Sequence, residues 1–301
     1  MKIRIIIALV LLSVLNQSWL FSQPTRVLHD QIQQITAGKQ ATVGVFVAGA
    51  DGKEVFSVHS HKRFPMQSVF KFHIALAVLS AVDEGKFTLD QQFGIQKKDL
   101  LPGLWSPLRE ANPEGGNFSI ASLIRYAVSQ SDNVACDALL RLMGGPEAVE
   151  AYFKKHQLND ISIKINEETM QSNWDRMFQN WTTPKAANEV LVTFHTNTNQ
   201  LLSGESHVFI WRMMRETETG VNRLKGQLPN GTVVAHKTGS SGSNEQGLTA
   251  AVNDIGIVFL PDGKFFYISI FITDSKEDEA TNDRLIANIA RACYDYFITQ
   301  P

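Results

Sequence analysis

The stretch 69–82 is the feature that most constrains how this chain can fold. Of its fourteen residues, only Lys71, His73 and Ser80 are polar. A helix that is apolar on nearly every side must lie inside a protein, with other elements packed around it. Gly85 follows shortly afterwards and is a suitable residue to end such a helix. We therefore predict a buried central helix around which the rest of the chain is arranged.

A hydroxyl and an amine stand together at the start of this predicted helix. Ser68 and Lys71 are three residues apart, a spacing that brings both side chains to one helix face. A buried lysine tends to lose its charge and can then act as a base. The helix N-terminus also offers backbone N–H groups to an oxyanion. The alternative is that Ser68 only caps the helix and that Lys71 extends outward to solvent.

Composition and charge exclude several classes of protein. The chain has 301 residues, of which 44% are hydrophobic and 19% are charged, and its net charge is −2. These values are typical of a globular protein long enough for one large domain or two. A near-neutral chain without a basic block argues against a nucleic-acid partner. The histidines are scattered and no Cys/His cluster has zinc spacing, so we predict no metal site.

The N-terminus has the pattern of an export signal peptide, predicted for residues 1–22. Basic residues precede the apolar run 5–15, and Ser22 is a small residue suited to a cleavage site. That run is too short to span a bilayer, and no later run is long enough for an anchor. We therefore expect a periplasmic or secreted mature chain, with no membrane anchor after signal removal.

Two cysteines, Cys136 and Cys293, are present. An exported protein could join them in a disulfide. Each also lies in an apolar helical run, where it could be a small buried hydrophobe. The sequence does not supply the geometry needed to decide, so both possibilities stay open.

Hydrophobic periodicity predicts strands near both ends of the chain and helices between them. The predicted strands are 41–48, 54–58, 232–236, 248–260 and 265–273. The predicted helices are 26–35, 69–82, 120–130, 134–143, 146–157, 184–195, 205–215 and 280–298. Two passages, 91–116 and 165–183, are predicted to be irregular. Strands that pair in one sheet despite this separation imply a helical domain inserted into an α+β domain.

Two further triplets carry polar groups suited to catalysis. Ser131-Asp132-Asn133 lies at an interruption between two predicted helices, and Lys237-Thr238-Gly239 lies at the end of a predicted strand. Each triplet alone is common, and Ser-Asp-Asn would ordinarily be a cap. In this order behind Ser-x-x-Lys, they form the signature of class A β-lactamases and penicillin-binding proteins.

The chain therefore resembles a class A serine β-lactamase over essentially its whole mature length. It is similar to the extended-spectrum branch typified by the PER and VEB enzymes. The resemblance implies an α+β fold, in which residues 23–63 and 213–301 form a three-layer α/β sandwich with an antiparallel sheet. Residues 64–212 would form the all-helical domain that carries the nucleophile, with the active site between the two. It also implies small β-lactam substrates, no cofactor and a monomer.

The same resemblance implies roles for the catalytic residues. Ser68 would attack the β-lactam carbonyl and form an acyl-enzyme, and Lys71 would help to remove its proton. Ser131 would pass a proton to the leaving lactam nitrogen. Backbone N–H groups of Ser68 and Ser240 would form the oxyanion hole.

Further residues would bind the substrate. Asn133 would donate to or accept from the side-chain amide of the substrate. Lys237 would add positive potential near its carboxylate, and Thr238 would contact that carboxylate. Trp105 would pack against the substrate at the rim, although it could instead be a hydrophobic anchor for a surface loop.

Class A enzymes also need a carboxylate that activates the hydrolytic water. In the family this glutamate lies 13 positions before the end of its loop, and Asn180 occupies the end position here, which gives Glu167. Its neighbour Glu168 is the other acidic residue of the pair. The alternative is that both glutamates form an ordinary charged surface.

The loop departs from the common family pattern at several positions. The usual closing Arg–Asp ion pair is absent, because Ile165 and Asn180 stand there. Glu168 replaces the usual proline, and since a non-proline cis bond costs roughly 3 kcal/mol, we expect a trans bond after Glu167. Gln171 replaces the usual water-holding asparagine. We therefore expect a rearranged loop and a wider or more mobile site that admits bulky oxyimino-cephalosporins.

The position of one arginine also differs from the common family pattern. The usual arginine on the strand after Lys-Thr-Gly is missing, whereas Arg223 precedes that motif. In the PER-like branch an arginine there takes over the contact with the substrate carboxylate. The alternative is that Arg223 is an ordinary surface residue.

Two rival functions share the three motifs. A D-alanyl-D-alanine peptidase or penicillin-binding protein would lack the deacylating glutamate, so Glu167 argues against it. A β-lactam sensor domain would acylate and stay acylated, but such sensors are usually joined to membrane helices. Turnover of nitrocefin by the purified protein would separate all three.

Overall fold

A computed structural model describes residues 25–300 of the chain. The export signal predicted for residues 1–22 lies outside the described residues. Within them, no helix is both long and apolar enough to cross a membrane.

The chain folds around a five-stranded antiparallel sheet in the order β2-β1-β10-β9-β8. The strands are β1 (Thr42–Ala48), β2 (Glu54–Val58), β8 (Val234–Ser240), β9 (Val252–Phe259) and β10 (Phe265–Thr273). Strand β1 pairs directly with β10, in a register that joins Thr42 to Thr273. The prediction that strands from both ends of the chain form one sheet is therefore confirmed.

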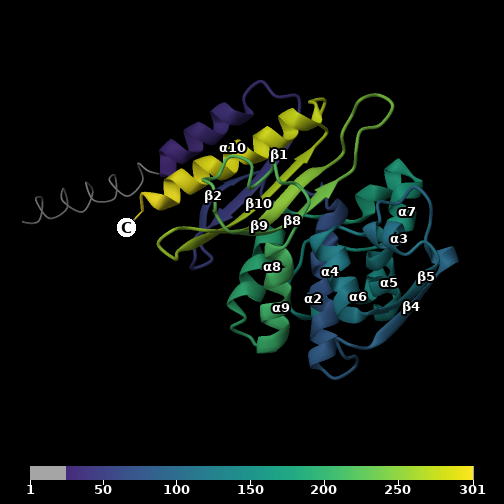
Figure 1. The fold of residues 1–301 in the computed structure, drawn as a ribbon. Helices are drawn as coiled ribbons and strands as arrows, with labels where there is room; N and C mark the ends of the chain where they lie inside the picture. Colours follow the sequence, from purple (N-terminus) through teal and green to yellow (C-terminus); the bar gives the residue numbers. More distant parts are fainter. Residues whose placement is uncertain (1–24, 301) are drawn as a thin grey trace, which may run out of the picture.

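Both faces of the sheet are covered, which gives three layers (Figure 1). Successive residues of a strand point to opposite faces: Val45 and Val47 join one apolar core, while Phe46 and Ala48 join the other. The first core lies under α10 (Glu279–Ile298) and the helix of residues 25–36. The second lies under α8 (Pro184–Thr196) and the remaining helices. The α+β class with an antiparallel sheet is thus confirmed.

The predicted central helix is α2 (Phe70–Asp83), and every residue from Phe70 to Ala81 is buried. It packs against four other helices of the block in the lower half of Figure 1. These are α4 (Ile120–Ser129), α5 (Asn133–Met143), α6 (Pro146–Lys155) and α9 (Gly204–Arg215). The helix ends before Gly85, whose φ of 76° is accessible to glycine at little cost.

The two passages predicted to be irregular contain short elements. The first holds the hairpin of β4 (Gln92–Gln96) and β5 (Gly115–Ser119), together with α3 (Pro107–Ala111). The second holds α7 (Glu167–Ser172), a 3₁₀ turn (Trp174–Gln179) and β7 (Trp181–Thr182). Side chains of Asn166 and Asn173 accept N–H bonds at the starts of α7 and the 3₁₀ turn. Elements this short depend on such caps rather than on a hydrophobic period, so periodicity missed them.

Two strand boundaries also differ from prediction. Strand β8 continues to Ser240, past the predicted bound at residue 236, and Lys237-Thr238-Gly239 lies at its end as predicted. Strand β9 begins only at Val252 rather than at residue 248. The remaining short strands, β3 (Phe64–Pro65) and β6 (Ile161–Ser162), pair with β7. The sheet therefore carries the Lys-Thr-Gly motif on its edge strand.

The two cysteines are free and buried. Cys136 lies on α5 in the core on one face of the sheet, and Cys293 lies on α10 in the core on the other face. The sheet separates them, so the disulfide that export would allow does not form, and each is a small apolar residue.

Shortening one side chain of the central helix should destabilise the fold. Leu76 is fully buried, so Leu76→Ala should lower the free energy of unfolding by about 2–5 kcal/mol through lost burial and a residual cavity. Val208 on α9 is 67% exposed, and Val208→Ala should change it by less than about 0.5 kcal/mol. Urea denaturation measures both. Equal effects of the two substitutions would contradict a packed core around α2.

Candidate active site

A cleft of about 370 Å³ separates the edge of the sheet from the helical block. Its wall on the sheet side is the end of β8, and its floor is the 3₁₀ turn (Gln67–Val69) just before α2. The two approach so closely that a Cβ on Gly239 would lie 2.6 Å from the carbonyl oxygen of Met66 and 3.2 Å from the nitrogen of Ser68. Only glycine permits this contact without displacing the backbone.

The structure brings all the residues predicted for the site to this one place. Eight of them line the cleft, namely Ser68, Trp105, Ser131, Asn133, Gln171, Arg223, Thr238 and Ser240. The other three, Lys71, Glu167 and Lys237, are at most 1% exposed and are linked to the lining by the hydrogen bonds described below.

The Lys71 ammonium donates hydrogen bonds to three other residues of the site. Its Nζ donates to Ser68 Oγ at 2.7 Å and to Asn133 Oδ1 at 2.8 Å, and it also donates to the Glu167 carboxylate. Lys71 is 0% exposed, so the alternative in which it extends to solvent is wrong. The capping alternative for Ser68 is also wrong, because no side chain caps the start of α2.

The charge state expected for Lys71 must be corrected. Burial, the largest effect, lowers the pKa of Lys71, but the adjacent Glu167 carboxylate and other nearby acidic groups outweigh it, so the pKa is raised. A buried ammonium can stay charged when an opposite charge lies beside it. In the free protein Lys71 is therefore a charged donor rather than the neutral base that its burial alone predicts.

Lys237 has the lowered pKa that burial alone would give Lys71. Its Nζ donates to Ser131 Oγ at 2.9 Å and to the carbonyl oxygen of Thr238 at 3.0 Å. Burial, and then the positive charge of Lys71, hold the pKa of Lys237 well below its usual value. The site therefore contains two buried lysines in different electrostatic surroundings, each bound to a serine hydroxyl.

Two residues of the site have strained backbones. Gln67, next to Ser68, has φ 46°, and Ser131 has φ 59°; such left-handed conformations cost of order 1 kcal/mol or more outside glycine. Asp132 stabilises the second, because its carboxylate accepts bonds from Ser106 Oγ, Leu108 N and Ala135 N. This buried cap fixes both Ser131 and the start of α3.

The two glutamates of the loop point in different directions. Glu167 is buried against Lys71, whereas Glu168 is exposed, so the alternative of a charged surface pair is wrong. Both backbone N–H groups donate to the carboxylate of Asp137, at 2.8 Å for Glu167 and 3.1 Å for Glu168. The described residues contain no cis peptide bond, which confirms the trans bond expected after Glu167.

Asp137 is a site residue that the sequence analysis missed. It is buried on α5, and burial followed by the neighbouring Glu167 charge raises its pKa to about 7. The available signal was a carboxylate inside the otherwise apolar run 134–140. Buried carboxylates are rare unless they have partners, and here the partners are backbone N–H groups of a distant loop.

Asn180 replaces the missing ion pair at the end of the loop. Its Oδ1 accepts the backbone N–H groups of Lys164 at 2.7 Å and Ile165 at 3.0 Å, and its Nδ2 donates to the carbonyl oxygen of Ile165 at 2.8 Å. Asn180 is fully buried. The two ends of the loop are therefore joined by hydrogen bonds from the neutral side-chain amide of Asn180. The missing ion pair does not by itself make the site wider or more mobile.

The remaining predicted residues lie around the mouth of the cleft. Arg223 is only 6% exposed and donates to Asp283 Oδ1 at 2.8 Å and to Ser240 Oγ at 2.6 Å, so it is not an ordinary surface residue. Trp105 is 57% exposed and donates from Nε1 to the carbonyl oxygen of Gln130 at 2.9 Å. Gln171 is exposed on α7.

A cleft that combines a serine hydroxyl, two buried lysines and a buried carboxylate is suited to acyl transfer by a serine nucleophile. Within residues 25–300, no group of three or more His, Cys, Asp or Glu side chains could hold a metal ion.

Comparison with known proteins supports this assignment. The family model described as the beta-lactamase enzyme family matches residues 27–297. The chain is 44% identical to beta-lactamase VEB-1 of Pseudomonas aeruginosa, with 100% of both chains covered, and 42% identical to the extended-spectrum beta-lactamase PER-1 of the same organism, with 97% of this chain and 94% of that one covered. The crystal structure of TLA-1 extended-spectrum beta-lactamase superposes with a TM-score of 0.88 at 42% identity, covering 91% of this chain and 99% of that one.

The raised pKa of Asp137 predicts a pH-dependent stability. An acid whose pKa is raised by folding stabilises the folded state at low pH, and this contribution is lost as pH rises from about 4 toward 7. Between about pH 5.5 and pH 8, the wild type should therefore lose about 1–2 kcal/mol of unfolding free energy relative to Asp137→Asn. Urea denaturation of both proteins at the two pH values measures this. A stability difference that stays constant with pH would contradict the assignment.

Proposed function

This chain belongs to the class A β-lactamases, enzymes that hydrolyse the β-lactam amide, and we propose that it acts through an acyl-enzyme on Ser68. The observation that carries this proposal is the position of Lys71 Nζ. It contacts Ser68 Oγ and the Glu167 carboxylate at once. One ammonium group thus connects the nucleophile to a base.

Acylation requires that Ser68 lose its proton as Oγ bonds to the lactam carbonyl carbon. Because the pKa of Lys71 is raised by Glu167, Lys71 must first pass a proton to that carboxylate before it can accept one from Ser68. The carbonyl oxygen then becomes an oxyanion, stabilised by the backbone N–H groups of Ser68 and Ser240. Glu167 is thus the final acceptor of the proton in this step.

Cleavage of the lactam C–N bond requires a proton on the leaving nitrogen. Ser131 supplies it from Oγ, and Lys237, which donates to that oxygen, restores the proton. The low pKa of Lys237 favours release of a proton to the serine. The opened ring remains attached to Ser68 as an ester.

Deacylation uses Glu167 as the general base, after the proton that it accepted during acylation has passed to solvent and Lys237 has taken one up. Its carboxylate removes a proton from water, and the water oxygen attacks the ester carbon. The ester C–O bond then breaks, and the proton that Glu167 took from water returns through Lys71 to Ser68 Oγ. The backbone contacts with Asp137 hold Glu167 at the required position, while Gln171 lines the cleft beside it.

The substrate is oriented by the residues that line the cleft. Asn133 binds the side-chain amide, and Thr238 and Lys237 attract the carboxylate. Arg223 holds Ser240 Oγ and is largely occupied by Asp283, so it acts on the carboxylate mainly through Ser240 and through its charge. Trp105, exposed at the rim, packs against the acyl side chain.

The wider context of the enzyme follows the same proposal. Residues 23–63 and 213–301 form the sandwich domain and residues 64–212 the helical domain, with the cleft at their boundary. The chain acts as a monomer in the periplasm or outside the cell, without a membrane anchor once its signal is removed, and confers resistance to penicillins and cephalosporins. A peptidase is less well supported, because it lacks the deacylating base that buried Glu167 supplies. A sensor domain is less well supported, because it would stay acylated.

Removing the base should trap the acyl-enzyme. Glu167→Gln removes the carboxylate that most strongly opposes the effect of burial on the pKa of Lys71. The pKa of Lys71 should therefore fall, so that Lys71 can deprotonate Ser68 itself. Acylation should therefore persist while deacylation slows by about 10²–10⁴. Intact-protein mass spectrometry after exposure to a cephalosporin should show an adduct that persists for minutes.

The neighbouring residue supplies the matched control. Glu168→Gln removes an exposed carboxylate from the same loop and should turn over without lasting adduct. The double variant Ser68→Ala, Glu167→Gln should give no adduct. Trapping by Glu168→Gln but not by Glu167→Gln would refute the assignment of the base.

Substrate range is the second test. Relatives such as PER-1 are named as extended-spectrum enzymes, so kcat/KM for cefotaxime should lie within about a thousandfold of that for benzylpenicillin, a margin of about 4 kcal/mol. Steady-state hydrolysis followed by absorbance measures both. A larger preference for the penicillin would rule out the extended-spectrum assignment.

A further inference from the structure

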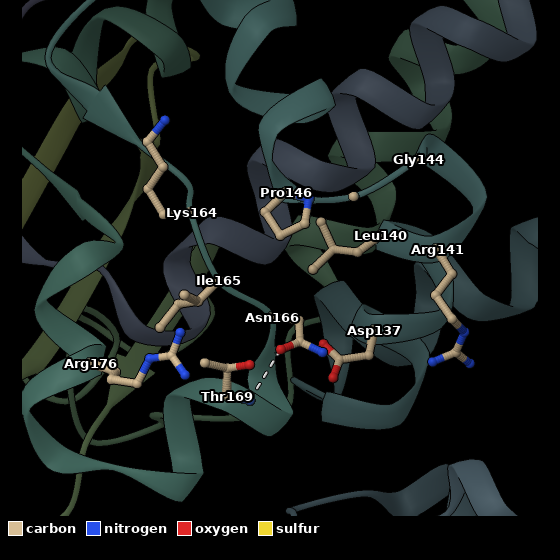
Figure 2. A pocket seen from close by; sticks show the side chains of 11 residues that line it. Asp137, Leu140, Arg141, Gly144, Pro146, Lys164, Ile165, Asn166, Thr169 and Arg176 are labelled. Carbon is tan, nitrogen blue, oxygen red and sulfur yellow. Dashed lines mark hydrogen bonds between the residues drawn. The ribbon is translucent and has the colours of Figure 1, made fainter.

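A second cavity, of about 470 Å³, lies beside the loop that carries Glu167 (Figure 2). It is bounded by α5, by the turn between α5 and α6, and by loop residues 164–176. Its lining residues are Asp137, Leu140, Arg141, Gly144, Gly145, Pro146, Lys164, Ile165, Asn166, Thr169 and Arg176. This volume falls in the range of small-molecule sites.

The loop forms a partition between this cavity and the substrate cleft. Asn166 and Thr169 line the second cavity, whereas Gln171 lines the cleft. Glu167 lies between them along the chain and is buried against Lys71. A molecule in the second cavity would therefore touch the loop without entering the cleft.

The rim of the cavity is positively charged. Arg176 forms no ion pair with any residue from 25 to 300, and Arg141 reaches only Asp99, at 4.0 Å. Figure 2 shows Arg176 beside Ile165 and Thr169, with Arg141 on the other side of the cavity. Lys164 differs, because its ammonium is paired with Glu150 at 3.0 Å. An arginine without an ion-pair partner has a planar guanidinium group that can donate two parallel hydrogen bonds to a carboxylate or sulfonate.

The rest of the lining combines donors with apolar surface. Asn166 uses its Oδ1 to cap Thr169 N at 3.1 Å, and in the described part of the chain its Nδ2 has no acceptor. Leu140, Ile165 and Pro146 supply apolar groups. Both oxygens of Asp137 accept N–H groups of the loop, so the anionic end of a ligand belongs at Arg176, away from that carboxylate.

We propose that this cavity is a second binding site, for a small organic anion that has an apolar body and a carboxylate or sulfonate group. Arg176 binds the anionic group, and the apolar floor binds the body. The occupant also changes the rate of deacylation, a part of the proposal that rests on the proposed role of Glu167. The physical link is direct, because Asn166 precedes Glu167 and Asp137 holds its backbone N–H at 2.8 Å. A ligand that binds one conformation of this loop more tightly than another increases the population of that conformation.

Binding is tested with naphthalene-2-sulfonate on the mature chain by isothermal titration. At about 0.3 kcal/mol per heavy atom, its Kd should be on the order of 1 mM. The uncharged naphthalene-2-sulfonamide should bind at least fivefold more weakly. Arg176→Gln should weaken sulfonate binding at least fivefold, whereas Arg284→Gln, which removes an exposed arginine on α10, should not. Equal binding of the two probes, or no effect of Arg176→Gln, would overturn the site.

The coupling is tested by nitrocefin turnover at saturating sulfonate. In the wild type kcat should change at least twofold with KM unchanged, and Arg176→Gln should need at least fivefold more sulfonate for half of its change. A rise in KM alone would mean that the sulfonate binds in the cleft and would overturn the proposal. Binding without an effect on kcat would overturn the coupling. If the wild type failed to hydrolyse nitrocefin, the proposed function would fail, while the titrations would still decide whether the site exists.

Discussion

The burial of the Lys71 ammonium is the constraint on which the rest of the site depends. A buried charge costs several kcal/mol unless it is paired and fully hydrogen-bonded. Here the compensation comes from three separate segments: Ser68 before the central helix, Asn133 at the start of α5, and Glu167 in the loop. Removing any one partner leaves a charged group incompletely satisfied. The same contacts that stabilise the charge therefore fix the relative positions of the catalytic elements.

This constraint also explains why the loop can lose its usual ion pair. Glu167 is attached to Lys71 by its side chain and to Asp137 by its backbone N–H. Asn180 closes the far end with three hydrogen bonds to the backbone at 164 and 165. Neutral amide–backbone bonds in a buried position carry no charge-desolvation penalty. The loop is thus held at both ends, and its outer side forms part of the second cavity.

Much of the fold was accessible from local sequence. The apolar run 69–82 required a buried helix, and it is the fully buried α2. Strands near both ends of the chain implied one sheet with an inserted helical block, which the pairing of β1 with β10 confirms. The short elements in 91–116 and 165–183 were missed, because a hairpin or a six-residue helix depends on caps and tertiary contacts rather than on periodicity.

The sequence by itself determined which chemical groups are available: Ser68, the two lysines and Glu167 follow from motif order and spacing. Only the tertiary structure decided in which direction the pKa of each lysine is shifted. Burial alone predicts a low pKa for both lysines, but Glu167 raises that of Lys71 while Lys237 has no carboxylate so close. The roles of Asp137 and Asn180 were likewise decided by folding, because their partners are backbone groups distant along the chain. Electrostatic interactions fall off with distance in space and not with separation in sequence, so no local pattern could specify them.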